Sequence, residues 1–279
     1  MMHIIRDIRF VFPSAIALIV IFVAVAGPLI APHGYYEMSL PNKLRPPFWL
    51  DGGSIEYPMG TDSLGRDILS RIIGGARTSL VASMLSILIG AGIGILIGIV
   101  SAYRGGTVDA LLMRVCDGFL SFPIILLALI LAISIGPGMQ TVVLAIGLVV
   151  WARYARVIRS EVLSLKERDF IVYARMVKCS KARILFRHLL PNLMGSILVL
   201  ATLQTGWAIV TEASLSFIGA GIPPPQPSWG GMVATGREYI GMAWWLTFFP
   251  GMSIAITVLA FNFLGDWLRD HLDPKLREL

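Results

Sequence analysis

Long stretches of the sequence carry almost no charge, and one basic segment, residues 151–191, separates two of them. The hydrocarbon core of a bilayer is about 30 Å thick, which a helix rising about 1.5 Å per residue crosses in roughly 20 apolar residues. We expect six such spans, over residues 10–31, 79–103, 117–135, 140–153, 192–217 and 243–264. The expected fold is therefore an all-α membrane protein with six transmembrane helices.

The composition supports a place in the membrane. Hydrophobic residues make up 56% of the 279-residue chain and charged residues 14%, whereas soluble domains carry about 25% charge. The net charge of +6 would suggest a nucleic-acid partner in a soluble protein, but many of the Lys and Arg residues lie in the basic segment. Membrane topology and contact with anionic lipid explain that charge, so we expect membrane lipid and no nucleic acid as a partner.

The basic segment contains ten Lys or Arg residues and three acidic ones. Positive charge resists translocation, so we expect this segment and both chain termini in the cytoplasm. The free thiols expected of Cys116 and Cys179 agree with that side. Apolar residues recur in the segment at the spacing of amphipathic helices, at Phe170, Tyr173, Met176, Val177, Ile184 and Leu185. Two interpretations stay open: a docking site for a cytoplasmic partner, or a solvated loop that only determines topology.

Two features surround the second span. Residues 61–80 place apolar side chains on one helical face, and we expect an amphipathic helix there, on the membrane surface or against another span. Within the span, Gly90, Gly94 and Gly98 repeat at four-residue spacing. Such a stripe of small residues predicts close contact with a neighbouring helix.

The fifth span is the most polar of the six, and it contains Gln204, Thr211 and Glu212. An ionisable residue inside a membrane is costly and marks function by default, so these three residues are candidates for lining a pathway. The alternative places Glu212 near the outer interface, hydrogen-bonded to a neighbouring helix.

Motifs for catalysis are missing from the sequence. It contains no phosphate-binding G-x-x-x-x-G-K-[ST] loop, no H-E-x-x-H, no C-x-x-C and no G-x-S-x-G. The four histidines are scattered, so we expect no catalytic, cofactor or metal site and no enzymatic activity. Six spans are also few for a self-sufficient carrier. A half-pathway driven by a partner fits better; an ion-coupled secondary carrier or channel, with Glu212 or Asp117 carrying the ion, is the alternative.

Five ordered motifs carry a family resemblance: residues 60–71, 214–219, 224–230, 261–266 and 272–277. On these the chain resembles the C-type permease subunit of bacterial ABC importers for dipeptides, oligopeptides or nickel. The resemblance implies the inner membrane, a second homologous permease subunit, two cytoplasmic ATPases that bind the ATP, and an extracytoplasmic binding protein. It also implies a division into an N-terminal part, 1–77, and a five-helix permease core, 78–279, with a coupling loop at 152–192.

Such permeases carry a cytoplasmic E-A-A motif, followed by Gly and later by Leu-Pro. The resemblance aligns residues 172–174 with E-A-A, Lys178 with the Gly, and 190–191 with Leu-Pro. It makes residues 166–185 a coupling helix between the fourth and fifth spans. A Lys can replace Gly wherever the backbone has negative φ. The implied ATPase-coupling residues are Phe170, Val172, Tyr173, Ala174, Arg175, Met176, Lys178, Leu190 and Pro191.

Overall fold

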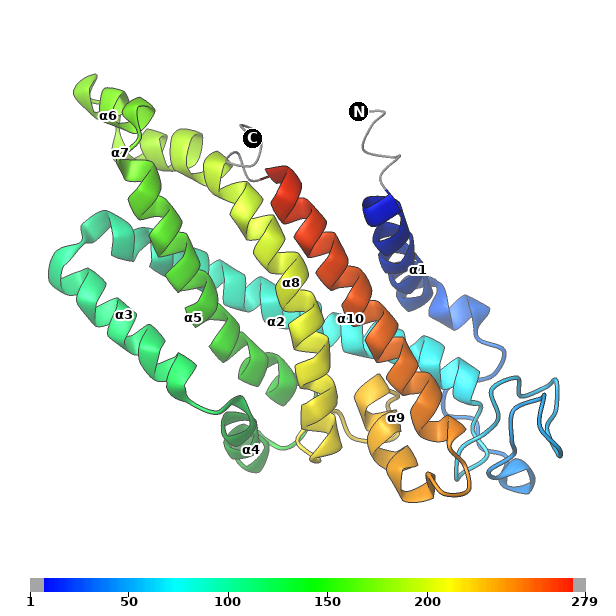
Figure 1. The fold of residues 1–279 in the computed structure, drawn as a ribbon. Coiled ribbons are helices and arrows are strands. Elements are labelled where there is room, and N and C mark those ends of the chain that lie inside the picture. Colours follow the sequence, from blue (N-terminus) through cyan, green and yellow to red (C-terminus); the bar gives the residue numbers. More distant parts are fainter. Residues whose placement is uncertain (1–7, 273–279) are drawn as a thin grey trace.

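A computed structural model describes residues 8–272, which form helices joined by loops and include no β-strand (Figure 1). The long helices are α1 (Ile8–Ile30), α2 (Ile68–Arg104), α3 (Gly106–Ser121), α4 (Ile124–Ile135), α5 (Met139–Lys166), α8 (Leu190–Phe217) and α10 (Trp245–Leu272). The short ones are η2 (Leu40–Asn42), α6 (Asp169–Met176), α7 (Lys181–Arg183), the π-helical turn η3 (Ile184–Leu189), α9 (Trp229–Gly236) and η4 (Arg237–Tyr239). The expected cytoplasmic flank before residue 8, and the last motif beyond residue 272, lie outside the described residues.

Within residues 8–272, five helices are long and apolar enough to cross a membrane, and one bent pair of helices makes a sixth span if the two are taken together. The break lies between α3 and α4, whose axes meet at 86°. A straight helix predicted over 117–135 is therefore wrong in detail. Pro123 accounts for the bend, because a proline disfavours the helical conformation in the preceding residue, and Phe122 has φ −82° and ψ 128°.

The predicted amphipathic helix over residues 61–80 is not a separate element. Helix α2 begins at Ile68, where Asp67 caps it by accepting a hydrogen bond from the Ser70 amide at 2.9 Å, and then continues unbroken to Arg104. Its first turns pack against protein, since a Cβ at Gly74 would meet the Tyr35 ring at 3.1 Å and one at Gly75 would meet Trp229 at 2.9 Å. These contacts place the start of α2 against the connector that precedes it and against α9 (Trp229–Gly236).

The small-residue stripe of α2 lies directly against α5. A Cβ at Gly90 would come within 2.7 Å of Val150, and one at Gly98 would come within 2.7 Å of the Ala155 carbonyl oxygen. At Gly94 the nearest atom is the Trp151 carbonyl oxygen, closer still. The prediction of close helix contact is confirmed, and we call this α2–α5 contact the glycine seam. Helix α2 crosses behind α5, α8 and α10, and α8 runs beside both α5 and α10 (Figure 1).

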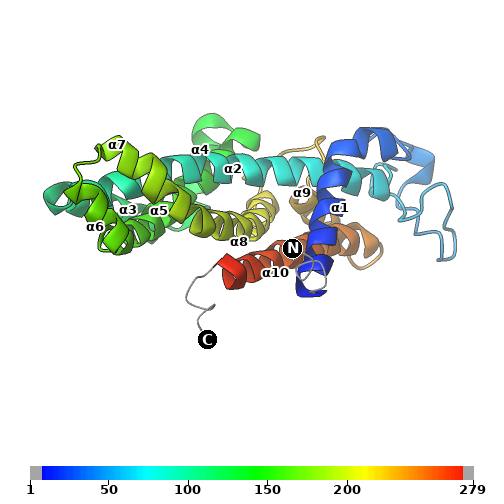
Figure 2. The same cartoon turned by 90° about the horizontal axis from the view of Figure 1, so that it is seen from above.

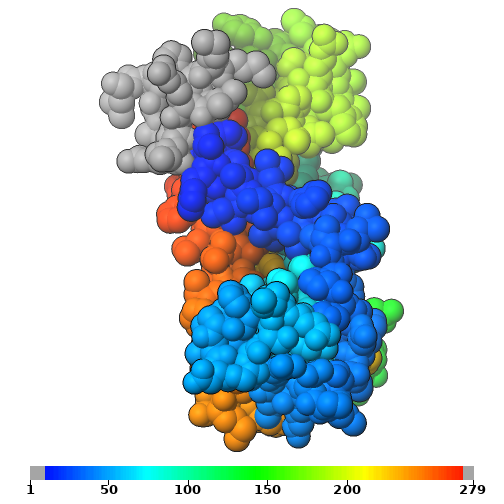
Figure 3. All heavy atoms as spheres, turned by 90° about the vertical axis from the view of Figure 1, so that its right-hand side faces the viewer, coloured from blue at the N-terminus to red at the C-terminus, as the bar shows by residue number. Residues whose placement is uncertain are grey.

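The molecule is elongated, and its two ends differ (Figure 2). Helices α6 and α7 lie on the same side of the molecule as the carboxyl end of α10 and the amino end of α1, at the top of Figure 1. At the other end, the connector between α1 and α2 lies beside α9 and the start of α10, as the light-blue and orange atoms of Figure 3 show. Loops of the connector are held by buried polar contacts, including one between the Trp245 Nε1 and the Thr61 carbonyl oxygen at 3.2 Å.

The end of α6 is closed by a paired hydrogen-bond motif. The Cys179 amide donates to the Ala174 carbonyl at 3.0 Å, and the Lys178 amide donates to the Arg175 carbonyl at 2.9 Å. This arrangement is the Schellman motif, which requires a left-handed residue after the helix, and Lys178 has φ +55°. Lys178 therefore adopts the backbone conformation that favours glycine, at a position where the family motif has Gly.

The glycine seam generates the first prediction. Gly94→Ala should destabilise the folded protein by about 1–3 kcal/mol, because the new methyl group forces α2 and α5 apart. Gly92→Ala is the matched control, since a Cβ there meets no atom within 4 Å and alanine favours a helix by up to about 1 kcal/mol. Thermal unfolding of the purified protein measures both. Equal thermal unfolding midpoints for Gly94→Ala and Gly92→Ala would contradict close packing at the glycine seam.

A second prediction concerns the end of α6. Lys178→Gly should stabilise this end by about 1 kcal/mol, because it removes the cost of a left-handed conformation from a residue with a side chain. Arg175→Gly, inside the same helix, should destabilise it by about as much. Hydrogen exchange of the α6 amides should slow in the first variant and accelerate in the second. Faster exchange in both would show that Lys178 is not strained.

Candidate coupling surface and polar groups of the spans

Helix α6 has one buried face that holds it to the rest of the chain. Ile171 and Ala174 are buried in a cluster with side chains of α2, α5, η3 and α8. The cluster consists of Ile99, Ala102, Ile158, Val162, Leu165, Ile171, Ala174, Ile184, Leu189 and Leu193. Because four other elements contribute to this cluster, α6 is fixed to the ends of the long helices rather than attached by a loop alone.

The opposite face of α6 exposes large apolar side chains. Tyr173 is 66% exposed and Met176 70% exposed, and Phe170 and Val177 lie beside them in the chain and are also exposed. We call these four residues the coupling patch. In the flanking sequence, exposed cations outnumber the exposed acids Glu167 and Asp169; the cations are Arg168, Arg175, Lys178, Lys181 and Arg183. An apolar centre with a basic rim is suited to bind an apolar groove edged by acidic groups.

The other expected coupling residues are divided between positions. Ala174 belongs to the buried base of α6 and Val172 is half-buried, whereas Leu190 and Pro191 begin α8, beyond η3. Phe170 of α6 and His188 of η3 link α6 to the start of α8, and their ring centroids are 6.4 Å apart. Sequence spacing missed Phe186, which is exposed in η3, because a π-helical turn shifts the register on which that spacing depends.

Charged contacts brace the same region. Arg159 of α5 donates from two nitrogens to the two carboxylate oxygens of Asp109 in α3, each at 2.5 Å. Lys166, at the end of α5, donates to the Ala102 carbonyl oxygen of α2 at 2.7 Å. A forked pair of this kind determines orientation as well as distance. The end of α5 that carries α6 is therefore tied to the junction of α2 and α3.

Glu212 lies in a closed hydrogen-bond network. Its side chain is fully buried and accepts hydrogen bonds from the hydroxyls of Ser79, at 3.0 Å, and Ser216, at 2.9 Å. The Ser79 hydroxyl also accepts from the Trp229 amide at 3.3 Å, so the network joins α2, α8 and α9. Thr211, one residue earlier, donates to the Trp207 carbonyl oxygen at 2.8 Å. These contacts correspond to the second interpretation of Glu212, a carboxyl hydrogen-bonded to a neighbouring helix.

Gln204, the third pathway candidate, joins α8 to α5. Its Oε1 accepts a hydrogen bond from Arg153 at 3.0 Å, and the Arg153 guanidinium lies 3.9 Å from the centroid of the Trp207 ring. Gln204 is half-buried. Asp117, the other candidate for carrying an ion, is exposed and forms an ion pair with Arg156 of α5.

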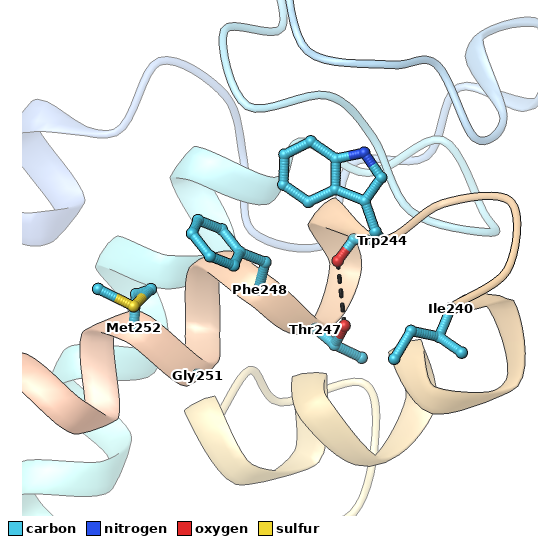
Figure 4. A pocket seen from close by; sticks show the side chains of 6 residues that line it. All are labelled: Ile240, Trp244, Thr247, Phe248, Gly251 and Met252. Atoms are coloured by element: carbon cyan, nitrogen blue, oxygen red, sulfur yellow. Dashed lines mark hydrogen bonds between the residues drawn. The ribbon is translucent and has the colours of Figure 1, made fainter.

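An open hollow of about 390 Å³ lies where η4 leads into α10. Figure 4 shows the side chains of Trp244, Phe248 and Met252 along one side of α10, with Ile240 facing them from the preceding segment. Thr247 also lines the hollow, and its hydroxyl donates a hydrogen bond to the Trp244 carbonyl oxygen at 3.0 Å. This surface suits lipid or another apolar helix, since aromatic residues gather where a membrane meets water.

Metal ligands do not cluster in the described part of the chain: residues 8–272 contain no group of three or more His, Cys, Asp or Glu side chains that could hold an ion. Cys116 is buried and Cys179 half-buried, and both are free thiols.

Comparison with known proteins identifies the family. Residues 94–278 match the family described as "Binding-protein-dependent transport system inner membrane component". The chain is 41% identical over 260 residues to the di/tripeptide transport system permease protein DppC of Pseudomonas aeruginosa, covering 93% of this chain and 86% of the relative. It is 44% identical over 227 residues to the glutathione transport system permease protein GsiD of Pectobacterium atrosepticum, covering 81% and 75%. The oligopeptide permease OppC of Bacillus subtilis is 37% identical over 263 residues, covering 94% and 84%.

A solved structure has the same fold. Inward-facing MetNI, a methionine ABC transporter, contains a chain that superposes with a TM-score of 0.61 at 18% identity, covering 72% of this chain and 96% of that one. The matched family region includes α5, α6 and α8, which carry the coupling patch and the expected pathway residues. The chain is therefore a multi-pass membrane protein that belongs to the binding-protein-dependent transport system inner membrane component family, the permease subunits of ABC importers.

Proposed function

We propose that this chain forms half of the translocation pathway of an ATP-driven peptide importer and docks an ATPase through its coupling patch. Membership of the family implies ATPase and binding-protein partners. The observation that carries the docking proposal is the two-faced α6, with Ile171 and Ala174 buried against four other elements and Tyr173 and Met176 exposed. An apolar face held on a rigid base is ready to bind without a cost of ordering.

We assign peptides as the substrate class. The relatives with the greatest coverage are named for di/tripeptides, dipeptides and oligopeptides, and another is named for glutathione, itself a short peptide conjugate. Identity near 40% over most of the chain supports the same class for this permease. Selection of a particular peptide belongs largely to the binding protein.

The assembly we propose contains a second homologous permease subunit, two cytoplasmic ATPases that bind ATP, and an extracytoplasmic binding protein. This chain itself carries no cofactor and catalyses no reaction. Both termini lie in the cytoplasm of a bacterial cell, on the side of the coupling loop 152–192. The location of the first turn of α1, the last turn of α10 and α6 on the same side of the molecule supports this topology (Figure 1).

Coupling between the ATPases and the spans depends on the buried contacts that hold the coupling patch to the long helices. When the ATPases close on ATP, residues 166–185 move with them, and the buried cluster under α6 passes that motion to α2, α5 and α8. The energy comes from the different nucleotide affinities of the two states, because a ligand shifts an equilibrium only by its differential affinity. Packed helices transmit such shifts as rigid bodies.

The alternative of an ion-coupled carrier has weaker support. Glu212 is enclosed by the hydroxyls of Ser79 and Ser216, and Asp117 is paired with Arg156. Both carboxyls therefore already have polar partners within the described residues. Transport of solute by this chain alone in proteoliposomes would nevertheless favour the carrier.

The docking surface generates a direct prediction. Met176→Asp should weaken binding of the ATPase subunits about tenfold or more, because it removes an apolar anchor worth roughly 1.5–3 kcal/mol when buried. Co-purification of the ATPases with the tagged permease measures the loss, and the spans should remain folded.

Met38→Asp provides the matched control. Met38 is 55% exposed, against 70% for Met176, and belongs to the connector between α1 and α2. That connector lies at the opposite end of the molecule from α6 (Figure 3). This variant should retain the ATPases in full. Equal retention of the ATPase subunits by Met176→Asp and Met38→Asp would contradict the docking proposal.

A further inference from the structure

A small pocket lies at the end of the molecule opposite the coupling patch. It has a volume of about 150 Å³ and is enclosed by the start of α2, the loop after α8, and α9. Its walls are mostly apolar, with Ile222, Pro223, Met232 and Ala234 among them. Two arginines, Arg66 and Arg71, also line it, and we call it the arginine pocket.

The charged side chains that line the pocket are both positive. The side chains of Arg66 and Arg71 are only 9% and 7% exposed, and no carboxylate belongs to the lining found within residues 8–272. Asp62 is the nearest acid, and it serves both arginines, with its Oδ2 2.6 Å from the Arg66 Nε and 3.6 Å from the Arg71 Nε. Both buried cations therefore form their ion pairs with this one carboxylate.

The other nearby acid, Asp67, is engaged through one of its two oxygens. Asp67 accepts hydrogen bonds from the Ser70 amide at 2.9 Å and the Ser70 hydroxyl at 2.5 Å, and His33 lies 3.5 Å from the same oxygen. Asp62 also accepts from the backbone amides of Leu64 and Arg66. The Asp67 Oδ1 has no hydrogen-bond partner among the described residues, and neither arginine forms an ion pair with Asp67 there.

The arginines keep donors for a ligand. A guanidinium has five N–H donors in a planar fork. Arg66 uses Nε for Asp62, and Arg71 uses one terminal nitrogen for the Tyr35 carbonyl oxygen at 3.1 Å. The remaining donors suit a planar carboxylate, which arginine binds through two parallel hydrogen bonds.

We propose that the arginine pocket binds the terminal carboxylate of a short peptide. This inference takes its class of substrate, peptides, from the proposed function. The two cations match the carboxylate, and the apolar walls beside them match the side chain of the last residue. A bound peptide would also touch the junction of α2, α8 and α9, since Ser216 lines the pocket and donates to Glu212.

A thiol placed on the wall tests the proposal without requiring transport. Thr235 lines the pocket from α9 and is exposed, so a Thr235→Cys variant presents its thiol to the cavity. In the full complex in nanodiscs, labelling at position 235 by a neutral thiol reagent is followed by mass spectrometry. Ala-Ala should protect the thiol at a concentration about tenfold or more below that needed for Ala-Ala amide, since hydrogen bonds to a charged group are worth about 1.5–3 kcal/mol.

Two further variants keep the arginines and their Asp62 contacts intact. Gln226 is an exposed part of the lining, and Gln226→Glu adds a negative charge to the same lining as the arginines. Added to Thr235→Cys, it should abolish the preference for the free carboxylate. Gln226→Met, of similar size and neutral, should preserve that preference.

Control ligands separate the possible sources of an oxyanion. Protection by inorganic phosphate or by phosphatidylglycerol nanodiscs, with none by Ala-Ala, would overturn the peptide proposal in favour of a phosphate or lipid site. Equal protection by Ala-Ala and its amide, or protection by neither, would overturn it as well. Peptide-stimulated ATP hydrolysis, measured on the same preparation, shows whether the proposed importer function stands when the pocket proposal fails.

Discussion

The contact between α2 and α5 supports everything else in the chain. Three glycines of α2 let the backbone of α5 approach so closely that a single methyl group would meet the Val150 side chain or the carbonyl oxygens of Trp151 and Ala155. Two buried clusters lie along this seam, one that includes Ile146 and Tyr154 and one beneath α6. Without a hydrophobic driving force between helices in lipid, such close packing is what holds spans together.

The seam also connects the two ends of the molecule. At one end, α2 and α5 form the base of α6 and are clasped by the Arg159–Asp109 pair. At the other, Ser79 of α2 joins the Glu212 network, whose Ser216 reaches the arginine pocket. A helix of 37 residues, about 55 Å long, joins these ends in one piece. Movement at the coupling patch can therefore reach the opposite end through a continuous helix and its partner.

Sequence patterns predicted much of this arrangement, for physical reasons. Apolar length identified the spans, glycine spacing identified the seam, and family motifs identified the permease. The bend at Pro123 was missed because a proline is tolerated in a straight membrane helix when neighbours shield its carbonyl. The paired charges of residues 62–71 gave no information about sidedness, and only the folded chain reveals that Arg66 and Arg71 share one carboxylate. Glu212, Gln204 and Thr211 stay predictions as pathway residues.

The central claim is that α6 and α7 move together with α2 as one rigid body. Spin labels at Ala182→Cys, on exposed α7, and Leu96→Cys, on the exposed face of α2, report the distance across the cluster beneath α6. Pulsed electron resonance on the full complex, without nucleotide and with ATP trapped, measures that distance in both states. We expect the same distance in each. A shift of several ångströms between them would mean that the coupling segment moves independently of the spans, and would contradict the account.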